Sequence, residues 1–376
     1  MKKLFFLLIW LFFWFTSSLQ SCLPQGITFS TQAQIDSFHT NYPNCTQIEG
    51  DVTISGNDIT NLNGLSVLTY IGGYLEINSN PALTSLSGLD NITSFGNDLY
   101  IEYNNLLTNL SGLDNVTSIG TDLSIVDNNN LGSLTGLNSL ISIGGMLYVQ
   151  GTNAFTNFSG LDNLTTIGDA LWIGYTTTLT NFTGLNKVTF IGGDIDIYNN
   201  DALTNFTGLS SLTSIGEGID IEYNVNALTS LTGLDNIADS SIKGIYFFYN
   251  LHLCTCSIKS ICNYLNSPNE LTVIESNANG CNSIQEVKDS CIVFSIKDTS
   301  SQQMFSIFPN PSVNKLTIQT SLDGQLSISN LNGQELITRQ ITEPKTQIDV
   351  SALPSGVYFV RLTNDRTVSM GKIIKQ

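Results

Sequence analysis

The chain has 376 residues, of which 41% are hydrophobic and only 12% charged, and its formal net charge is −17. This length allows more than one domain, and the acidic balance argues against nucleic acid and anionic lipid as partners. Residues 307–376 hold seven Lys/Arg and five Asp/Glu, a net charge of +2. The other seven Lys/Arg and 26 Asp/Glu precede them, so the acidic character belongs to the rest of the chain, with a net charge of −19.

The first residues have the pattern of a targeting signal. Lys2 and Lys3 precede a twelve-residue apolar run (4–15), and small and polar residues follow up to Cys22. This run is shorter than a typical transmembrane helix, so residues 1–21 are predicted to be a secretory signal peptide. No later stretch of the sequence is apolar enough to span a bilayer.

One sequence of 24 residues recurs from Leu68 onward, and its first copy reads LTYIGGYLEINSNPALTSLSGLDN. Seven copies begin at Leu68, Ile92, Val116, Leu140, Leu164, Val188 and Leu212. Degenerate copies precede them (46–67) and follow them (237–253). Self-similarity at a fixed period of this size predicts a solenoid, in which each coil buries its apolar side only against its neighbours.

Apolar residues two positions apart, such as Leu75 and Ile77, predict one short strand in every copy. We expect these strands to lie parallel in one sheet, with Leu75-type side chains buried and Glu76-type side chains exposed. The predicted strands are Tyr74–Asn78, Leu99–Tyr103, Leu123–Asp127, Leu147–Gly151, Leu171–Tyr175, Ile195–Asn199, Ile219–Tyr223 and Ile245–Tyr249. About nine coils, each rising about 4.8 Å, make a stack about 43 Å long.

Columns of identical residues mark the corners of the predicted coil. Two glycine columns begin at Gly72 and Gly88, and a column of asparagine begins at Asn80 and is interrupted by Thr152 and Thr176. Glycine suits a corner that needs positive φ or close backbone approach. An inward asparagine at a bend satisfies the backbone of the next coil, so we expect a buried asparagine ladder.

The pattern L-x-I-x-x-N followed by L-T-x-L-x-G-L resembles two related families, the leucine-rich repeat and, more closely, the receptor L domain and its microbial surface relatives. The resemblance covers about residues 46–253. It implies an all-β fold, a right-handed β-helix, with cysteine-bearing caps at its ends. It says little about a ligand, because the repeated residues are the structural ones.

Cysteines flank the repeats. Cys45 lies at the first coil, far along the stack from the five later cysteines, so its expected partner is Cys22. Residues 22–45 then form an N-terminal cap, with Ile35, Phe38 and Tyr42 on a short amphipathic helix. Because residues 19–22 also form a loose lipobox, lipidation of Cys22 is the alternative.

Five cysteines cluster in residues 254–291, namely Cys254, Cys256, Cys262, Cys281 and Cys291. This segment resembles the cysteine-bearing cap that closes such repeat arrays, with two short helices (258–265 and 283–290) around a strand (271–274). Exported chains usually oxidise their cysteines, so disulfides are favoured over a zinc site. An odd number leaves one cysteine free, and Cys254 is the candidate; the pairing of the other four is open.

After a polar linker (292–306), residues 307–376 alternate short strands with Gly, Asn and Pro turns, which predicts a small Ig-like β-sandwich. This part of the chain resembles the type A sorting domain of type IX secretion in Bacteroidota. The resemblance rests on four motifs in this order: FPNP (308–311), KLTI (315–318), NGQE (332–335) and GVYFVR (356–361). The resemblance implies that the translocon reads this domain. The expected location is the exterior of a Gram-negative outer membrane or the medium.

The outward residue of each predicted strand belongs to a column of aromatic and acidic side chains. Aromatic rings beside polar groups suit a sugar or a protein partner, although such ladders also stabilise sheets without any ligand. The candidate ligand-binding residues are Tyr100, Tyr148, Trp172, Tyr175, Asp196, Asp220, Tyr223 and Tyr246.

Asp196 and Asp220 are expected one coil apart, with Asp194 and Glu222 close by. Paired carboxylates occur in glycoside hydrolases, and they also attract Ca²⁺. The sequence has only two histidines and no Ser-His-Asp or Cys-His pattern. We therefore expect a non-catalytic, exported binding or adhesion module without a cofactor or metal. A polysaccharide-active enzyme using these two aspartates and a purely structural surface spacer are the alternatives.

Overall fold

The computed structural model describes residues 21–267, 271–294, 305–331, 333–364 and 368–376. Nearly all of the predicted signal peptide (1–21) and most of the predicted linker (292–306) lie outside these residues. The chain divides into two compact units, Met1–Val293 and Phe294–Gln376, which are described one after the other. Within the described ranges, no helix has the length and apolar character needed to cross a membrane.

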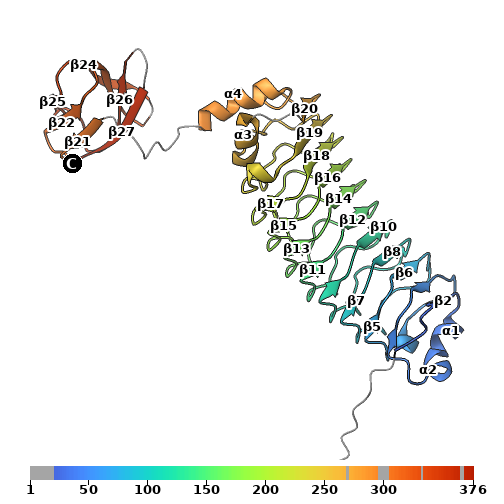
Figure 1. Cartoon of the computed structure of the whole chain (residues 1–376). Helices are drawn as coiled ribbons and strands as arrows, with labels where there is room; N and C mark the ends of the chain where they lie inside the picture. Colours follow the sequence, from blue (N-terminus) through green and yellow to red (C-terminus); the bar gives the residue numbers. More distant parts are fainter. Residues whose placement is uncertain (1–20, 268–270, 295–304, 332, 365–367) are drawn as a thin grey trace, which may run out of the picture. The chain divides into compact units, whose positions relative to one another are not determined.

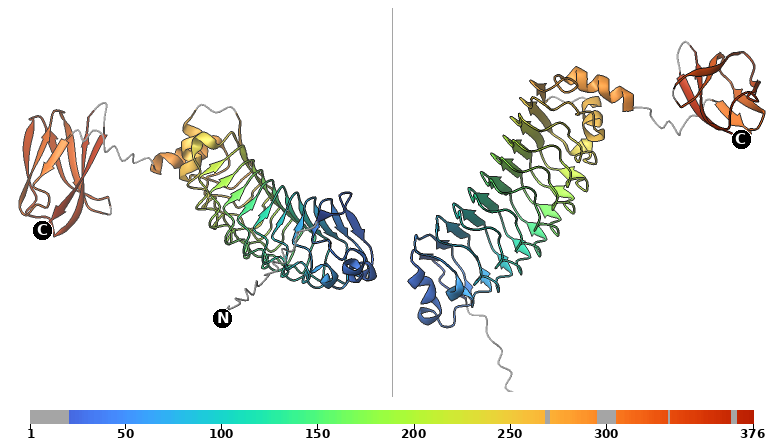
Figure 2. Two further views of the ribbon diagram at one scale, coloured as in Figure 1. Left: turned by 60° about the horizontal axis from the view of Figure 1, so that its bottom comes forward. Right: turned by 180° about the vertical axis from the view of Figure 1, so that it is seen from behind.

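The first unit is a stack of parallel β-coils (Figures 1 and 2). Its main sheet has eleven strands, which are β2 (Ile27–Phe29), β4 (Val52–Ile54), β6 (Leu75–Asn78), β8 (Leu99–Glu102), β10 (Leu123–Val126), β12 (Leu147–Gln150), β14 (Leu171–Gly174), β16 (Ile195–Tyr198), β18 (Gly218–Glu222), β19 (Gly244–Phe248) and β20 (Thr272–Glu275). Leu75 is the register partner of Leu99, and Leu99 that of Leu123, so each step of 24 residues adds one coil. The predicted parallel solenoid is confirmed, and β2, β4 and β20 extend its sheet at the two ends.

A second parallel sheet runs along another side of the coils. Its strands have two residues each and are β1 (Ser21–Cys22), β3 (Gln47–Ile48), β5 (Tyr70–Ile71), β7 (Ser94–Phe95), β9 (Ser118–Ile119), β11 (Ser142–Ile143), β13 (Thr166–Ile167), β15 (Phe190–Ile191) and β17 (Ser214–Ile215). We did not predict this sheet, because two residues are too few to show an alternating pattern.

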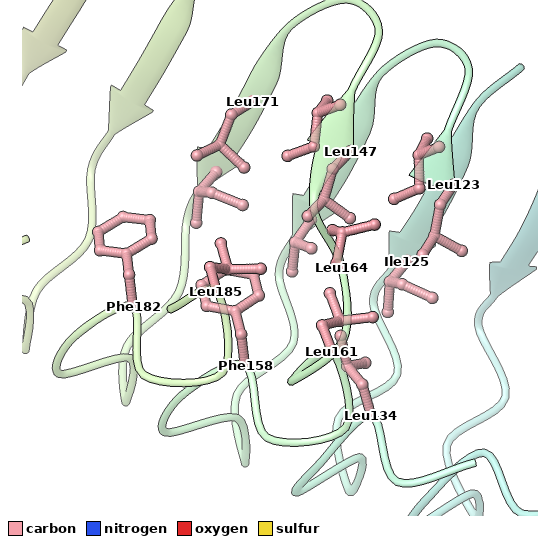
Figure 3. Packing of buried hydrophobic residues seen from close by; sticks show 14 of the residues in the cluster. Leu123, Ile125, Leu134, Leu147, Phe158, Leu161, Leu164, Leu171, Phe182 and Leu185 are labelled. Atoms are coloured by element: carbon pink, nitrogen blue, oxygen red, sulfur yellow. The ribbon is translucent and has the colours of Figure 1, made fainter. Parts of the chain in front are cut away.

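The interior is a continuous column of apolar side chains. Leu123, Leu147 and Leu171 are fully buried, and Figure 3 shows these equivalent residues side by side on successive coils. Phe158 and Phe182 replace the leucine of earlier coils, and their stacked rings have centroids 5.5 Å apart. Each coil covers the core of the next, so no coil has an independent core.

The predicted asparagine ladder is present in the interior. Asn104 donates through Nδ2 to the carbonyl oxygens of Ile77 (2.7 Å) and Glu102 (2.8 Å). Its Oδ1 accepts from the backbone N–H of Asn80 at 3.1 Å. One side chain thus satisfies three buried backbone groups on two coils. Asn277, in the C-terminal cap, continues the ladder by accepting from the backbone of Asn250 at 3.0 Å, which sequence reasoning missed.

The two glycine columns serve different needs. Gly88 has a φ of +109°, a conformation that residues with a Cβ rarely adopt. Gly120 has no such φ, but a Cβ there would lie 1.8 Å from the carbonyl oxygen of Gly96 on the preceding coil. The Gly88 column therefore turns the chain, and both columns let neighbouring coils approach, since a Cβ on Gly88 would lie 2.1 Å from the carbonyl oxygen of Leu62.

Caps close both ends of the stack (Figure 1). The N-terminal cap carries two short helices, α1 (Gln32–Asp36) and α2 (Phe38–Asn41), rather than one, and it buries Ile35 and Phe38. The C-terminal cap has α3 (Lys259–Asn266) and α4 (Ile284–Phe294) on either side of β20. Single 3₁₀ turns, η1 (Asn63–Leu65) and η2 (Asp239–Ser241), lie beside the caps.

Disulfides lie in both caps. The bonded pairs are Cys22–Cys45, Cys256–Cys281 and Cys262–Cys291, whereas Cys254 is free and exposed. The first bond joins β1 to the start of the first coil. Within the C-terminal cap, whose pairing the sequence left open, one bond joins α3 to α4 and the other joins the segment before α3 to the turn after β20.

The second unit is a sandwich of two antiparallel sheets. One contains β21 (Phe305–Phe308), β22 (Lys315–Thr320) and β25 (Lys345–Asp349); the other contains β23 (Gly324–Ser329), β24 (Glu335–Ile341), β26 (Gly356–Thr363) and β27 (Val368–Lys375). Its core, which includes Ile318, Ile328 and Val360, is separate from the core of the solenoid. The predicted all-β fold of this unit is confirmed.

Candidate functional site

The outward face of the main sheet carries the predicted columns in register. Along one column lie Glu76, Tyr100, Ser124, Tyr148, Trp172, Asp196, Asp220 and Tyr246. The expectation that these side chains are exposed is wrong for most of them: Tyr148, Trp172, Asp196 and Asp220 are half-buried, and Ser124 is buried. Neighbours in parallel strands lie about 4.8 Å apart, so each side chain covers the flank of the next.

The residue that directly follows each strand of the main sheet from β6 to β20 adopts the left-handed backbone conformation. The non-glycine residues of this column are Ser79, Tyr103, Asp127, Tyr175, Asn199, Tyr223, Tyr249 and Ser276, with φ between +50° and +58°. We predicted the tyrosines as the last residues of their strands, but each of these strands ends one residue earlier, and the left-handed conformation was not predicted. It turns Tyr175 and Tyr249 outward, and they are 46% and 43% exposed.

Aromatic side chains from five successive coils touch one another and form what we call the aromatic stripe. Its members are Tyr148, Trp172, Tyr175, Tyr198, Tyr223, Phe248 and Tyr249. Ring centroids are 5.3 Å apart for Tyr175 and Tyr198, and 5.2 Å for Tyr198 and Tyr223. Two predicted site residues lie apart from it: Tyr100 packs on Tyr74, and Tyr246 pairs in register with Asp220.

A shallow pocket of about 360 Å³ opens on β14, β16 and β18 beside the stripe. We call it the acidic pocket; it is lined by Trp172, Tyr175, Asp196, Ile197, Tyr198, Asp220 and Glu222. Four of these residues were predicted site residues. Tyr198 and Glu222 belong to the next outward column, two positions after Asp196 and Asp220, and we did not include them.

Two carboxyl groups of the acidic pocket, those of Asp196 and Asp220, have strongly raised pKa values. Burial first, and then the negative charges of Asp220, Asp194 and Glu222, together raise the pKa of Asp196 to about 7. Burial also raises the pKa of Asp220 to about 6, helped by Asp194 and Glu222. Near neutral pH the pocket therefore holds a mixture of protonated and ionised carboxyls.

These carboxyls differ from others on the same face in their hydrogen bonding. Glu76 accepts from Asn78 at 3.2 Å, and Glu102 accepts from Ser124 at 3.4 Å. Within the described ranges, the side chains of Asp196 and Asp220 have no hydrogen bond or ion pair. Nor do the described residues contain a group of three or more His, Cys, Asp or Glu arranged to hold a metal ion.

Comparison with known families agrees with both units. Residues 44–135 match the receptor L domain, and residues 306–376 match the secretion system C-terminal sorting domain. The first match covers the early coils, and the same parallel pairing of successive coils continues to β19. No curated protein matches the chain.

The chain is therefore similar to two families at once, a receptor L-domain solenoid and a type IX secretion sorting domain. The sorting domain directs export to the cell surface or into the medium. It also implies an interaction with the secretion system.

Proposed function

We propose that this exported protein is a non-catalytic binding module whose ligand, a glycan or a protein, lies across the aromatic stripe. The observation that carries the proposal is the continuity of the stripe. Aromatic rings from five coils touch in sequence, and Tyr175 and Tyr249 are nearly half exposed. Contiguous exposed aromatic surface on a rigid sheet offers contact area at a small entropic cost.

The left-handed tyrosines support a role beyond packing. Asn and Gly adopt positive φ more readily than tyrosine, and a disfavoured backbone conformation costs about 1–2 kcal/mol. The same column contains Asn199 and Gly151, which accommodate this conformation at low cost. Tyr175 and Tyr223 therefore stand where asparagine suits the backbone better, which supports a role of their rings in contact with a ligand.

A glycan array, together with a panel of surface proteins from the same environment, tests the proposal. The double variant Tyr175→Asn, Tyr223→Asn removes two rings from the stripe while keeping a residue that favours positive φ. We expect it to lose binding of the parent's ligand and to melt at the same temperature as the parent or higher.

Tyr103→Asn is the matched control, because Tyr103 has the same backbone conformation three coils away and is not part of the stripe. We expect it to bind like the parent. If the double variant binds as tightly as the parent, the ligand binds at another site. If the parent binds no glycan or protein, the alternative of a purely structural surface spacer is favoured.

The raised pKa values of Asp196 and Asp220 also favour a second candidate, a polysaccharide-active enzyme. Two carboxyls, one protonated and one ionised near neutral pH, are the groups that glycoside hydrolysis requires. The array ligands supply the test. Release of shorter products by the parent, and not by Asp196→Asn, would replace the binding proposal with this one.

A further inference from the structure

We propose that the acidic pocket binds an organic cation, an ammonium or guanidinium group carried by the ligand. This proposal rests on the proposed function, since it names the chemical class that the same face recognises. It starts from three features of the pocket: its carboxylates have no cationic partner, its walls are aromatic rings, and its size fits one terminal group of a larger ligand.

The first feature is unpaired charge. Asp196, Asp220 and Glu222 come from two adjacent strands and line the same pocket. Asp194 lies close enough for its negative charge to raise the pKa of both Asp196 and Asp220. The only ion pair in the described part of the chain joins Lys243 to Glu217. The repeats contain one other cation, Lys187, whose Nζ donates to Asn163. Among the described residues of the solenoid, no cation therefore pairs with the carboxylates of the pocket.

The second feature is the aromatic wall. Trp172, Tyr175 and Tyr198 line the pocket together with the carboxylates. A cation over an aromatic face is attracted to the ring quadrupole, and Trp and Tyr are the strongest such partners. Carboxylates and rings around one small cavity therefore attract the same ligand group, whereas a neutral sugar leaves the carboxylates uncompensated.

The third feature is the size and shape of the site. A pocket of about 360 Å³ that is open to solvent fits one terminal group of a larger ligand. Ammonium and guanidinium groups also donate several hydrogen bonds, which Asp196 and Asp220 are free to accept. A lysine or arginine side chain, a polyamine and a deacetylated amino sugar all present this chemistry.

The test is calorimetric titration of the full chain with short peptides. One peptide carries a single central lysine, the second carries arginine there, and the third carries the same lysine acetylated at Nζ, which removes the charge and keeps the length. Spermidine and a glucosamine oligosaccharide form two further arms that identify the source of the cation. We expect at least one cationic probe to bind, and the acetylated peptide to bind at least about tenfold more weakly.

Asp196→Asn and Asp220→Asn neutralise the pocket with little change of shape. Each is expected to weaken binding of the cationic probe about tenfold, equivalent to about 1.4 kcal/mol. Asp127→Asn is the matched control: it removes one carboxylate from the same face, about three coils or 14 Å away, beyond the screening length at physiological salt. We expect it to change the affinity about twofold at most.

Measurable binding that is equal for the charged and acetylated peptides would overturn the proposal, as would equal losses in all three variants. An array ligand that is neutral, needs Tyr175 and Tyr223, and binds Asp196→Asn normally would overturn the cation and leave the binding module standing. If neither the array nor any cationic probe shows binding, both the cation site and the binding module are ruled out. Calcium binding that blocks the probes, reversed by a chelator, would assign the pocket to a metal and also overturn the proposal.

Discussion

The indole ring of Trp172 lies flat against the phenol ring of Tyr148, with ring centroids 4.4 Å apart and an interplanar angle of 13°. The two residues are register partners on β12 and β14, and the Tyr148 hydroxyl donates to Gln150. Both side chains are half-buried. The pair therefore supports the sheet and also forms one end of the aromatic stripe.

Replacing either ring should consequently affect stability as well as binding. We expect Trp172→Ala to lower the free energy of unfolding by about 2 kcal/mol, because half-buried area and stacking are both lost. A double-mutant cycle with Tyr148→Ala should show a coupling of about 0.5–1.5 kcal/mol, measured by denaturant unfolding. Strictly additive losses would show that the stacking contributes nothing beyond burial.

Neutralising the acidic pocket should stabilise the solenoid at alkaline pH. The pKa values of Asp196 and Asp220 are raised from 3.8 to about 7 and about 6. The folded state therefore binds more protons than the unfolded state between about pH 4 and pH 7. Because of this difference, the free energy of unfolding of the solenoid falls as the pH rises through that window. Asp194 and Glu222 face the pair and strengthen the effect.

The measurement is the difference in melting temperature between Asp196→Asn and the parent at several pH values. The variant is expected to gain stability over the parent from pH 5 to pH 8 and to keep a flatter profile. A constant difference across this range would mean that Asp196 titrates like an ordinary surface carboxyl.

The asparagine ladder can be shortened and repaired. Asn104→Ala leaves the carbonyl oxygen of Ile77 and the N–H of Asn80 without their partners, and should lower the free energy of unfolding by about 3 kcal/mol.

Thr152→Asn should instead raise the free energy of unfolding by about 1 kcal/mol, because no described ladder bond reaches the N–H of Asn128 across this break. Denaturant unfolding measures both changes, and a Thr152→Asn variant less stable than the parent would show that the coil has no room for the amide.

The disulfide between Cys22 and Cys45 should stabilise the first coils locally. Cys45→Ser is expected to lower stability by about 2–4 kcal/mol. Because each coil contacts only its neighbours, hydrogen exchange should rise around β2 and β4 and stay unchanged near β16. A lipid found on Cys22 by mass spectrometry would contradict the bond.

The sorting domain should be separable from the solenoid. The two units have separate cores, so deleting residues 306–376 is expected to leave the melting of the solenoid unchanged. The truncated protein, which lacks residues 306–376, should remain inside the cell envelope of a host with the matching secretion system. Residues 306–376 fused to a foreign protein should carry it to the surface, and surface labelling distinguishes these outcomes.

Much of the fold was predictable because the contacts repeat with the sequence. In a solenoid, residue 75 touches residue 99 for the same reason that residue 99 touches residue 123, so the 24-residue period specifies both the parallel register and the inward faces. Gly88 and Asn104 were predictable as corner residues, since only a few residue types meet the needs of a bend. The motifs between residues 308 and 361 likewise indicated the sorting domain.

The tertiary structure alone decided the features that depend on neighbours across coils. Positive φ at Tyr175 has no local signature, because tyrosine disfavours that conformation, and only the closure of each coil imposes it. Burial decided that Trp172 stacks rather than projects, and it raised the pKa of Asp196 far beyond what sequence spacing indicates. The acidic pocket exists because Tyr198 and Glu222, from the adjacent column, close around the aspartates, and only the packed sheet defines that enclosure.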